Sequence, residues 1–399
     1  MGRLLIVSFD AVGDHLFERL LAYPRFAGLA EGSAVSRNVR TVFLSNTYPV
    51  HASVVTGLVP GEHGVVSNTE VFPRRHPRWN FEARGIRART IWEEAAALGH
   101  STAAVLWPVT GGARTVTYNI PEILALPGQN QVLENLRAGS KRLQIELFAR
   151  YRRLLRGTAQ PELDRFVASC AAAILREKRP GLTLVHFTAY DTLCHAGGET
   201  AEVMDRAFAA LDENLGVLLD AAGEETAVIV FSDHAQIDTH TVVTPNDLLV
   251  DAGLLEKGRG LLQKSGGYRL GNDAHNGGFF ECAGGSAFLH GSGLPPQAVE
   301  DMRGIVMRSA GFNRFLTDGE MRECGHDGLS FGFCAKRGYC YENYPKTLKS
   351  QHGYPLDYER YAVFYLARRK DSNGANVREE KNGGSLLDIA PLARDILAE

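Results

Sequence analysis

The chain has 399 residues, of which 44% are hydrophobic, and its formal net charge is -3 at pH 7. This balance argues against a nucleic-acid polymer or a membrane surface as the main partner. An anionic substrate would therefore need positive charge supplied locally, by metals or by a few Lys or Arg side chains. The length fits two domains, or one large α/β domain with insertions.

The start of the chain and its cysteines bear on the compartment. No charged and then apolar leader precedes the first predicted strand, and no apolar run reaches membrane-spanning length. We therefore expect a soluble, cytoplasmic protein. The six cysteines are scattered, which favours reduced thiols over a disulfide framework. Cys324, Cys334 and Cys340 lack paired C-x-x-C spacing, so we do not expect a zinc site there.

Strands and helices alternate in the first part of the chain. An apolar strand at residues 3–9 ends at Asp10, and residues 16–29 contain a short amphipathic helix. A second helix starts near Thr47, a third covers residues 90–98, and a strand follows at 101–106. This alternation predicts a mostly parallel sheet with helices on both faces.

Residues 107–160 interrupt the alternation with Pro and Gly residues and then a basic helical stretch at 132–156. We interpret them as a helical insertion that covers a site. Beyond it, a helix at 161–178, a strand at 182–188, a helix at 201–222 and a strand at 226–231 complete two further βα units.

The last third contains a second kind of pattern. A helix starts at 244–250. Short antiparallel strands at 268–270, 278–282 and 286–290 and a helix at 296–310 indicate a smaller α+β insertion. A strand at 361–367 and a C-terminal helix at 386–397 return to the core. We therefore divide the chain into a catalytic core (1–257), the smaller insertion (258–349) and the return to the core (350–399).

Thr47 follows a strand-like segment and precedes a helix in which Val50, Val54 and Val55 recur at helical spacing. Pro49 suits the first turn of that helix, and Gly57 suits its C-terminal cap. Unpaired N–H groups and the helix dipole favour a phosphate oxygen at such a terminus. We interpret Thr47 as a nucleophile, although an isolated Thr before a helix is more often an ordinary cap.

Candidate metal ligands follow three predicted strands: Asp10, Asp191 and the pair Asp233-His234. Open α/β sheets bind ligands at the carboxyl ends of their strands, so these groups can converge. Asp191 and His195 are four residues apart, on one face of a helical turn. Asp233 and His234 either serve neighbouring sites or approach one ion from a sharp turn.

His352, beside Gly353, is a further candidate ligand. Mixed carboxylate and imidazole ligands suit zinc, with manganese or iron as alternatives. Two such ions about 4 Å apart would clamp the attacking and leaving oxygens of a phosphoryl displacement. A metal also turns the Thr47 hydroxyl into a useful nucleophile.

Five stretches carry a resemblance to a known family: SFDAVG at 8–13, NTYPVHASVVTGLVPGEHG at 46–64, YDTLCHAG at 190–197, FSDH at 231–234 and QHG at 351–353. Together they resemble the alkaline phosphatase superfamily, and most closely its type I phosphodiesterase/nucleotide pyrophosphatase branch. The resemblance spans nearly the whole chain and implies an alkaline-phosphatase-like α/β fold.

The resemblance also implies a site with two zinc ions per chain. One zinc would be held by Asp191, His195 and His352, and the other by Asp10, Asp233, His234 and the Thr47 hydroxyl. Asn68 falls where the family has an Asn that hydrogen-bonds a phosphate oxygen, and with the Thr47 N–H it would form an oxyanion-type pocket.

The implied reaction is attack by Thr47, a phosphothreonyl intermediate, and hydrolysis by a water on the first zinc. The expected function is cleavage of phosphodiester or pyrophosphate bonds in a small anionic phosphoester, with a nucleotide as one candidate. The sequence leaves open a phosphonoacetate-hydrolase-like or phosphomonoesterase activity with the same site, a non-catalytic metal-binding protein, and the oligomeric state. A sulfatase is disfavoured because Thr47 replaces the Cys or Ser that such enzymes oxidise.

Several residues beside the matched motifs have two interpretations. We expect structural roles for His51 and His63, although both match family positions. We expect packing for four others, of which the aromatic ones could alternatively stack on a base: Trp107, Tyr190, Tyr354 and Cys194.

Overall fold

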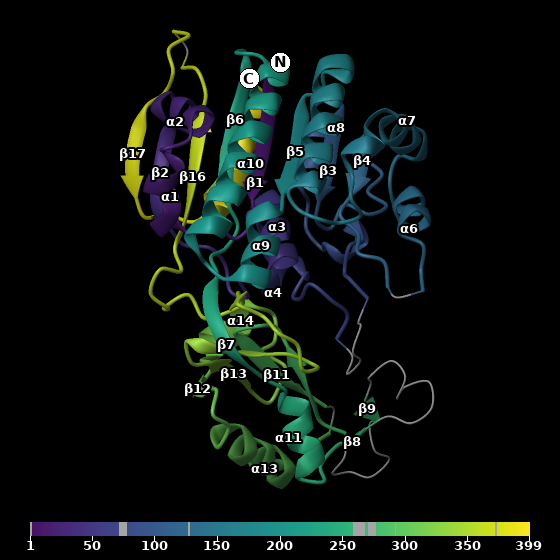
Figure 1. Cartoon of the computed structure of the whole chain (residues 1–399), viewed down its shortest axis with the longest axis vertical. Helices are drawn as coiled ribbons and strands as arrows, with labels where there is room; N and C mark the ends of the chain where they lie inside the picture. Colours follow the sequence, from purple (N-terminus) through teal and green to yellow (C-terminus); the bar gives the residue numbers. More distant parts are fainter. Residues whose placement is uncertain are drawn as a thin grey trace.

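The computed structural model describes residues 2–71, 78–126, 128–257, 268–269, 277–291, 293–371 and 373–399. Figure 1 shows a large sheet with its helices and, below it, a smaller part built from short strands. No helix among these described residues combines the length and the apolarity that crossing a membrane requires.

The central sheet has eight strands in the order β17-β2-β16-β6-β1-β5-β3-β4. Their bounds are β1 Arg3–Phe9, β2 Ala34–Val39, β3 Thr102–Trp107, β4 Tyr118–Pro121, β5 Leu182–Phe187, β6 Thr226–Ser232, β16 Val363–Arg368 and β17 Glu379–Asn382. The five strands from β6 to β4 are parallel, and β16 runs antiparallel to β6 and β2. The predicted mostly parallel sheet is confirmed.

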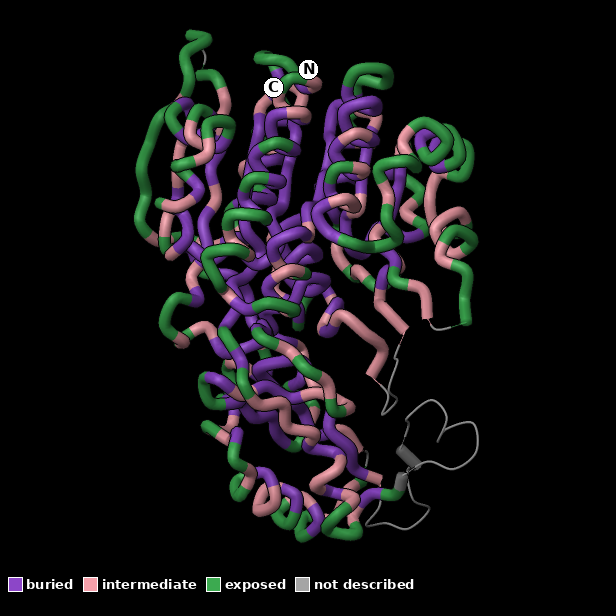
Figure 2. The backbone as a smooth tube through the Cα atoms, in the orientation of Figure 1, coloured by how far each residue is buried: buried purple, intermediate pink, exposed green. Residues whose placement is uncertain are grey.

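Helices cover both faces of the sheet, because successive strand residues point to opposite sides. Leu5 and Val7 of β1 belong to the apolar cluster under one set of helices, whereas Leu4 and Ile6 belong to the cluster under the other. The first set is α2 Pro24–Glu31, α8 Glu162–Lys178 and α10 Ala201–Ala222; the second is α3 Thr47–Thr56, α5 Ile91–Ala97 and α15 Ile389–Ala398. In Figure 2 the central strands β1, β5 and β6 are buried, the edge strand β17 is exposed, and the outer sides of α8 and α10 are partly exposed.

The segment at 107–160, expected to be a helical insertion, lies at one edge of the sheet and also contributes the edge strand β4 beside β3. Its helical stretch is two helices, α6 Gln131–Ala138 and α7 Lys141–Tyr151, not the single run expected at 132–156. The break falls at Gly139, where a side chain would come within 2.6 Å of the Asn119 carbonyl oxygen. The backbone leaves the helix at Gly139 in an extended conformation, and its close approach to Asn119 explains why this position has no side chain.

The smaller part contains a four-stranded antiparallel sheet, β10-β11-β13-β12, and a three-stranded sheet, β14-β7-β15. The strands are β7 Ile237–Val243, β10 Phe279–Cys282, β11 Ser286–His290, β12 Phe312–Phe315, β13 Gly332–Ala335, β14 Gly338–Tyr341 and β15 Ser350–Gln351. Its helices are α11 Pro245–Asp251, α13 Pro296–Met307 and α14 Asp318–Glu323. The two-residue strands β8 Glu256–Lys257 and β9 Tyr268–Arg269 pair with each other.

Residues on both sides of the 258–349 segment contribute to this smaller part. Strand β7 pairs with β14 and β15, and Leu249 of α11 belongs to the same apolar cluster as Phe280 of β10. The predicted strands at 278–282 and 286–290 are present, and residue 270 of the predicted strand at 268–270 lies outside the described residues.

Candidate metal and phosphate site

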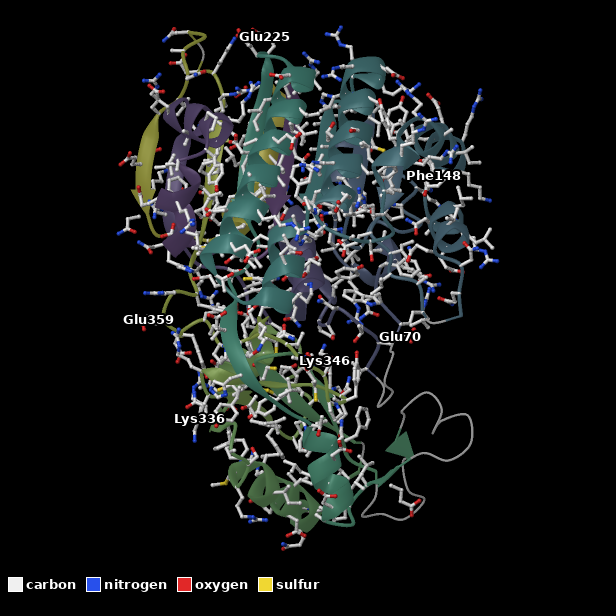
Figure 3. All side chains as sticks on the ribbon, viewed as in Figure 1. Glu70, Phe148, Glu225, Lys336, Lys346 and Glu359 are labelled. Carbon is white, nitrogen blue, oxygen red and sulfur yellow. The ribbon has the colours of Figure 1, made fainter. Side chains whose placement is uncertain are left out.

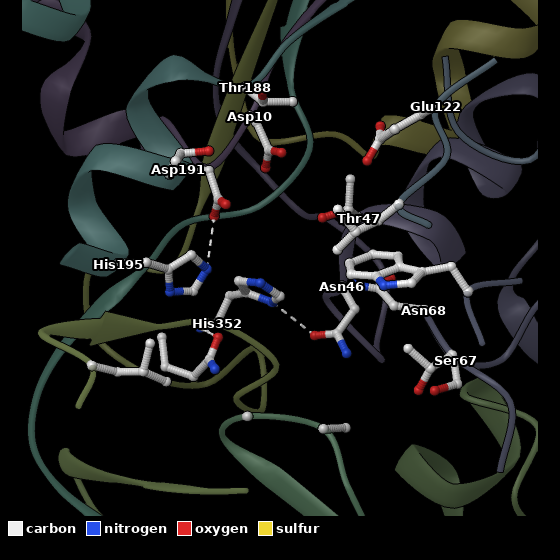
Figure 4. A pocket seen from close by; sticks show the side chains of 18 of the residues that line it. Asp10, Asn46, Thr47, Ser67, Asn68, Glu122, Thr188, Asp191, His195 and His352 are labelled. Carbon is white, nitrogen blue, oxygen red and sulfur yellow. Dashed lines mark hydrogen bonds and ion pairs between the residues drawn. The ribbon is translucent and has the colours of Figure 1, made fainter. Parts of the chain in front are cut away.

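Polar side chains gather where three neighbouring parallel strands end. Asp10 follows β1, and Asp233 and His234 follow β6. Helix α9 Ala189–Gly197, which carries Asp191 and His195, follows β5. Because β5, β1 and β6 are parallel neighbours, their carboxyl ends share one edge. Figure 4 shows Asp10, Asp191, His195 and His352 on one side of a pocket and Thr47 facing them.

The first cluster consists of Asp191, His195 and His352, whose candidate ligand atoms lie within 4.8 Å of one another. His195 Nε2 is 3.2 Å from Asp191 Oδ1, as expected for residues four apart on one helix. His352 follows β15, so the smaller part supplies this third member. The cluster therefore joins the two parts of the molecule.

The second cluster consists of Asp10, Asp233 and His234, again within 4.8 Å. His234 Nε2 lies 3.5 Å from Asp10 Oδ1, 3.3 Å from Asp233 Oδ2 and 3.3 Å from Thr47 Oγ1. Asp233 and His234 thus approach one point, which is the second of the two arrangements left open by the sequence. The rings of His234 and His352 stack at 4.2 Å, so the clusters adjoin.

Outer hydrogen bonds orient the imidazoles of the first cluster. His195 Nδ1 lies 2.8 Å from the Ser350 carbonyl oxygen, and His352 Nδ1 lies 2.8 Å from Asn46 Oδ1. In each ring the Nδ1–H donates, which leaves the Nε2 lone pair for a ligand. The side-chain amide of Gln236 donates to Asp191 Oδ1.

The second cluster has the properties of a cation site. Asp10 and Asp233 are buried, and Asp10 Oδ1, Asp233 Oδ2 and His234 Nδ1 have no hydrogen-bond partner among the described residues. Burial, followed by the charges of Asp233 and Asp191, raises the pKa of Asp10 well above its usual range. Buried carboxylates this close together need a compensating positive charge, so these residues fit a divalent cation.

Electrostatics also prepare the first cluster. Burial acts to raise the pKa of Asp191, but the charge and hydrogen bond of His195, together with the charges of His352 and His234, outweigh it and the pKa is lowered. Burial acts to lower the pKa of His195, and Asp191 outweighs it in the opposite direction. Burial, followed by His234, lowers the pKa of His352 and so keeps a neutral ring available as a ligand.

Thr47 is the first residue of α3, and its side chain reaches the pocket. Asn68 Oδ1 accepts a hydrogen bond from the Tyr48 N–H at 2.8 Å, so the Asn68 amide has its Nδ2 donors left for a phosphoryl oxygen. Gly57 caps the helix with φ 78° and its N–H donates to the Ser53 carbonyl, as predicted.

A cavity of about 640 Å³ opens in front of Thr47. The core contributes Trp79, the 107–160 segment contributes Ile123 and Leu124, and the smaller part contributes Glu342 and Lys346. Among the described lining residues, Lys346 is the one Lys or Arg side chain. Figure 3 shows Lys346 near the level where the two parts meet.

The residues with two interpretations pack inside the protein. His51 Nδ1 donates to the Thr47 carbonyl at 2.8 Å. His63 Nε2 lies 2.9 Å from Ser53 Oγ. The other four are at most 1% exposed, and none of them lines the cavity: Trp107, Tyr190, Cys194 and Tyr354. No described cysteine belongs to a metal-ligating cluster.

Sequence reasoning missed His186 and Glu122. His186 of β5 is fully buried; its Nε2 lies 3.2 Å from Asp10 Oδ2 and its Nδ1 lies 2.9 Å from Glu122 Oε2. Burial acts to lower the pKa of His186, but these carboxylates raise it well above its usual range. A histidine inside a buried strand that is apolar apart from Thr183 was the available signal, whereas nothing local marked Glu122.

A mostly parallel sheet covered on both faces, with paired Asp/His clusters and a hydroxyl at its carboxyl edge, defines an alkaline-phosphatase-like α/β fold with a candidate metal site. The model of one family, type I phosphodiesterase / nucleotide pyrophosphatase, matches residues 4–278. The chain belongs to this family.

Two curated relatives and one solved structure illustrate the similarity. Human ectonucleotide pyrophosphatase/phosphodiesterase family member 5 is 32% identical over 116 residues, which are 27% of this chain and 24% of the relative. The human bis(5'-adenosyl)-triphosphatase is 31% identical over 119 residues, 27% of this chain and 25% of the relative. The matches thus span about a quarter of these relatives' length.

The solved structure is murine ectonucleotide pyrophosphatase/phosphodiesterase 5, an inactive variant in complex with AMP. It has a TM-score of 0.68 and 15% sequence identity, with 100% of this chain and 95% of that chain covered. This likeness shows the fold.

Proposed function

We propose that the protein is a metal-dependent hydrolase that cleaves phosphodiester or pyrophosphate bonds, with Thr47 as the nucleophile. The observation that carries the proposal is the position of Thr47 Oγ1, 3.3 Å from His234 Nε2 at the start of a helix. A buried hydroxyl beside two carboxylate and imidazole clusters suits attack on phosphorus.

Two metal ions are part of this proposal. Asp191, His195 and His352 would hold one zinc, and Asp10, Asp233, His234 and the Thr47 hydroxyl would hold the other; manganese and iron are alternatives for this donor set. When bound, the cations supply charge that offsets the anionic substrate and favours the ionised form of the Thr47 hydroxyl.

In this proposal, each side chain of the site has its own role in the reaction. Thr47 Oγ gives up its proton and forms a bond to phosphorus, while the bond from phosphorus to the leaving-group oxygen breaks and that oxygen departs with its electron pair and takes up a proton; this gives a phosphothreonyl intermediate. Water then attacks the same phosphorus, the bond from phosphorus to Thr47 Oγ breaks, and a proton from the water restores the Thr47 hydroxyl. The Asn68 amide, held through Tyr48, donates to a phosphoryl oxygen. Asn46 and Ser350 hold the imidazoles in place.

The substrate in this proposal is a small anionic phosphoester, and a nucleotide fits it. One relative is named a bis(5'-adenosyl)-triphosphatase, and one similar solved structure is a complex with AMP. The cavity offers Trp79 and the aliphatic residues Ile123 and Leu124 as walls for a flat group. Lys346 in the same cavity favours a second candidate, a substrate with a further acidic group, such as a phosphomonoester or a phosphonate that carries a carboxylate.

The test is turnover of a bis-nitrophenyl phosphodiester and of the corresponding monoester by the zinc-loaded chain. We expect Thr47→Ala to lose activity by at least about a thousandfold while it keeps its zinc. Thr47→Ser, which retains a hydroxyl, is the matched control and should keep part of the activity. Normal turnover by Thr47→Ala, or no turnover of any ester by the loaded wild type, would overturn the proposal. The ratio of diester to monoester activity separates the two candidates.

A further inference from the structure

A separate group of ligating side chains lies in the smaller part, away from the sheet edge. Glu281 of β10, His290 of β11 and His326, which follows α14, have candidate ligand atoms within 4.8 Å of one another. We propose that these residues form an additional zinc site, separate from the pair at the sheet edge. The inference does not depend on the proposed function.

The two imidazoles converge on one carboxylate. Nε2 of His290 lies 2.8 Å from Glu281 Oε2, and Nε2 of His326 lies 3.0 Å from the same oxygen. His326 Nδ1 lies 3.0 Å from the Cys324 carbonyl oxygen, to which it donates. This outer hydrogen bond orients the ring so that Nε2 faces Glu281, where it would offer its lone pair to a bound metal in the manner of a metal-ligating histidine.

The surroundings are apolar and leave one carboxylate oxygen unsatisfied. The Phe279 ring stacks on His290, and the Phe288 ring lies 4.2 Å from that of His326. Glu281 is buried, and its Oε1 has no hydrogen-bond partner among the described residues. An unpaired oxygen on a buried carboxylate is costly, and a cation beside it would remove that cost.

Two imidazoles and one carboxylate are a three-ligand zinc set that keeps a fourth position open. The His290 side chain is 18% exposed, so the fourth position can hold a water and an ion can enter from solvent. The competing account is a metal-free cluster of charge-assisted hydrogen bonds, which also form at 2.8 and 3.0 Å. Zinc content separates the two accounts.

A metal here would also stabilise one wall of the cavity. Strands β10 and β11 form a hairpin whose connection includes Ala283 and Gly284, both of which line the cavity. The next residue, Gly285, donates its N–H to the His352 carbonyl at 2.7 Å. The additional site would therefore join this hairpin to the segment after α14 and hold the wall near His352.

The experiment measures zinc per chain after dialysis, and the thermal midpoint with and without added zinc. The variants are Glu281→Gln and His290→Gln, and His240→Gln, an exposed imidazole of the same part, is the control. We expect the two cluster variants to bind one zinc ion fewer than the wild type and to lose part of the zinc-dependent stabilisation. The control should match the wild type.

A fourth variant, Asp191→Asn combined with Asp233→Asn, separates this inference from the proposed function. It should lose zinc from the sheet edge and still bind one ion that the further change His290→Gln removes. Unchanged zinc content in both cluster variants, or no zinc in the Asp191→Asn/Asp233→Asn chain, would overturn the inference. His290 is partly exposed, so its variant should fold even if Glu281→Gln does not.

Discussion

The hydrogen bonds around single side chains decide what Thr47 can do. The Asn68 side-chain oxygen accepts a hydrogen bond from the Tyr48 N–H, so the NH₂ group of the same amide is available to donate to a phosphoryl oxygen. We expect Asn68→Ala to lower kcat for a phosphodiester by about a hundredfold to a thousandfold, as removal of one oxyanion donor does elsewhere. Single-turnover kinetics would measure it. A kcat within twofold of the wild type would show that Asn68 does not contact the phosphoryl group.

Protonation of His63 should make the stability of the folded protein depend on pH, whether or not metal is bound. Its Nδ1 accepts the Val65 N–H, so its Nε2–H donates to Ser53 Oγ, and a proton on Nδ1 would break the first bond. Burial lowers the pKa of His63 from 6.5 to about 4. Because the folded pKa is depressed, its stabilising contribution is present above pH 6.5 and is lost as the pH falls toward 4.

Urea unfolding at several pH values tests this contribution. Between pH 7 and pH 4, the free energy of unfolding of the wild type should fall by up to about 3 kcal/mol more than that of His63→Gln. Equal losses in the two proteins would mean that His63 is protonated in the folded state without penalty.

Individual site residues were predictable where a strand or helix fixed their position. Asp10, Asp191 and His195 could be placed from strand ends and helical spacing, and in the structure all three line the same cavity as His352. His186 and Glu122 could not be placed, because the contacts of His186 with Asp10 and with Glu122 join separate strands and an irregular segment. The roles of all these residues stay predictions until metal and activity are measured.

At the scale of elements, two glycines give opposite predictions for the same substitution. Gly28 lies on the exposed side of α2, where a Cβ would meet nothing within 4 Å. Gly57 caps α3 with φ 78°, and a Cβ would lie 3.3 Å from the Ala390 side chain. Gly28→Ala should stabilise the protein by about 0.5–1 kcal/mol, whereas Gly57→Ala should destabilise it by about 1–2 kcal/mol.

Urea unfolding of the wild type and of both glycine variants under the same conditions measures the two changes in the free energy of unfolding. A change of the same sign at the two positions would contradict the conformational argument.

Elements with strong periodicity were predicted well, and several strands without an uninterrupted apolar pattern were missed. Helix α10 and strand β1 have the predicted bounds, because each has an uninterrupted pattern. Strands β7 and β17 were missed; every residue of β17 is exposed, so no alternation of buried and exposed residues marks it. Pairing with β2 defines β17, and local sequence cannot report that contact.

At the scale of the whole molecule, the smaller part supplies the cavity with its one described Lys or Arg. Lys346 Nζ lies 2.9 Å from Glu342 Oε1, and both residues line the cavity. We expect Lys346→Met to lower kcat/KM about tenfold for substrates with an anionic leaving group, and much less for a nitrophenyl diester. Lys336→Met, at an exposed position, is the control. An equal effect on both substrates would show that Lys346 does not select the leaving group.

The central claim is that two Asp/His clusters from distant parts of the chain bring a reacting phosphorus to Thr47. The most direct measurement mixes the zinc-loaded protein with a nitrophenyl phosphodiester, quenches the mixture in acid within milliseconds, and locates any added mass by peptide mass spectrometry. We predict a phosphoryl ester on Thr47 that forms as nitrophenol is released and then decays. Full turnover with no covalent adduct on Thr47, or an adduct on another residue, would contradict the account.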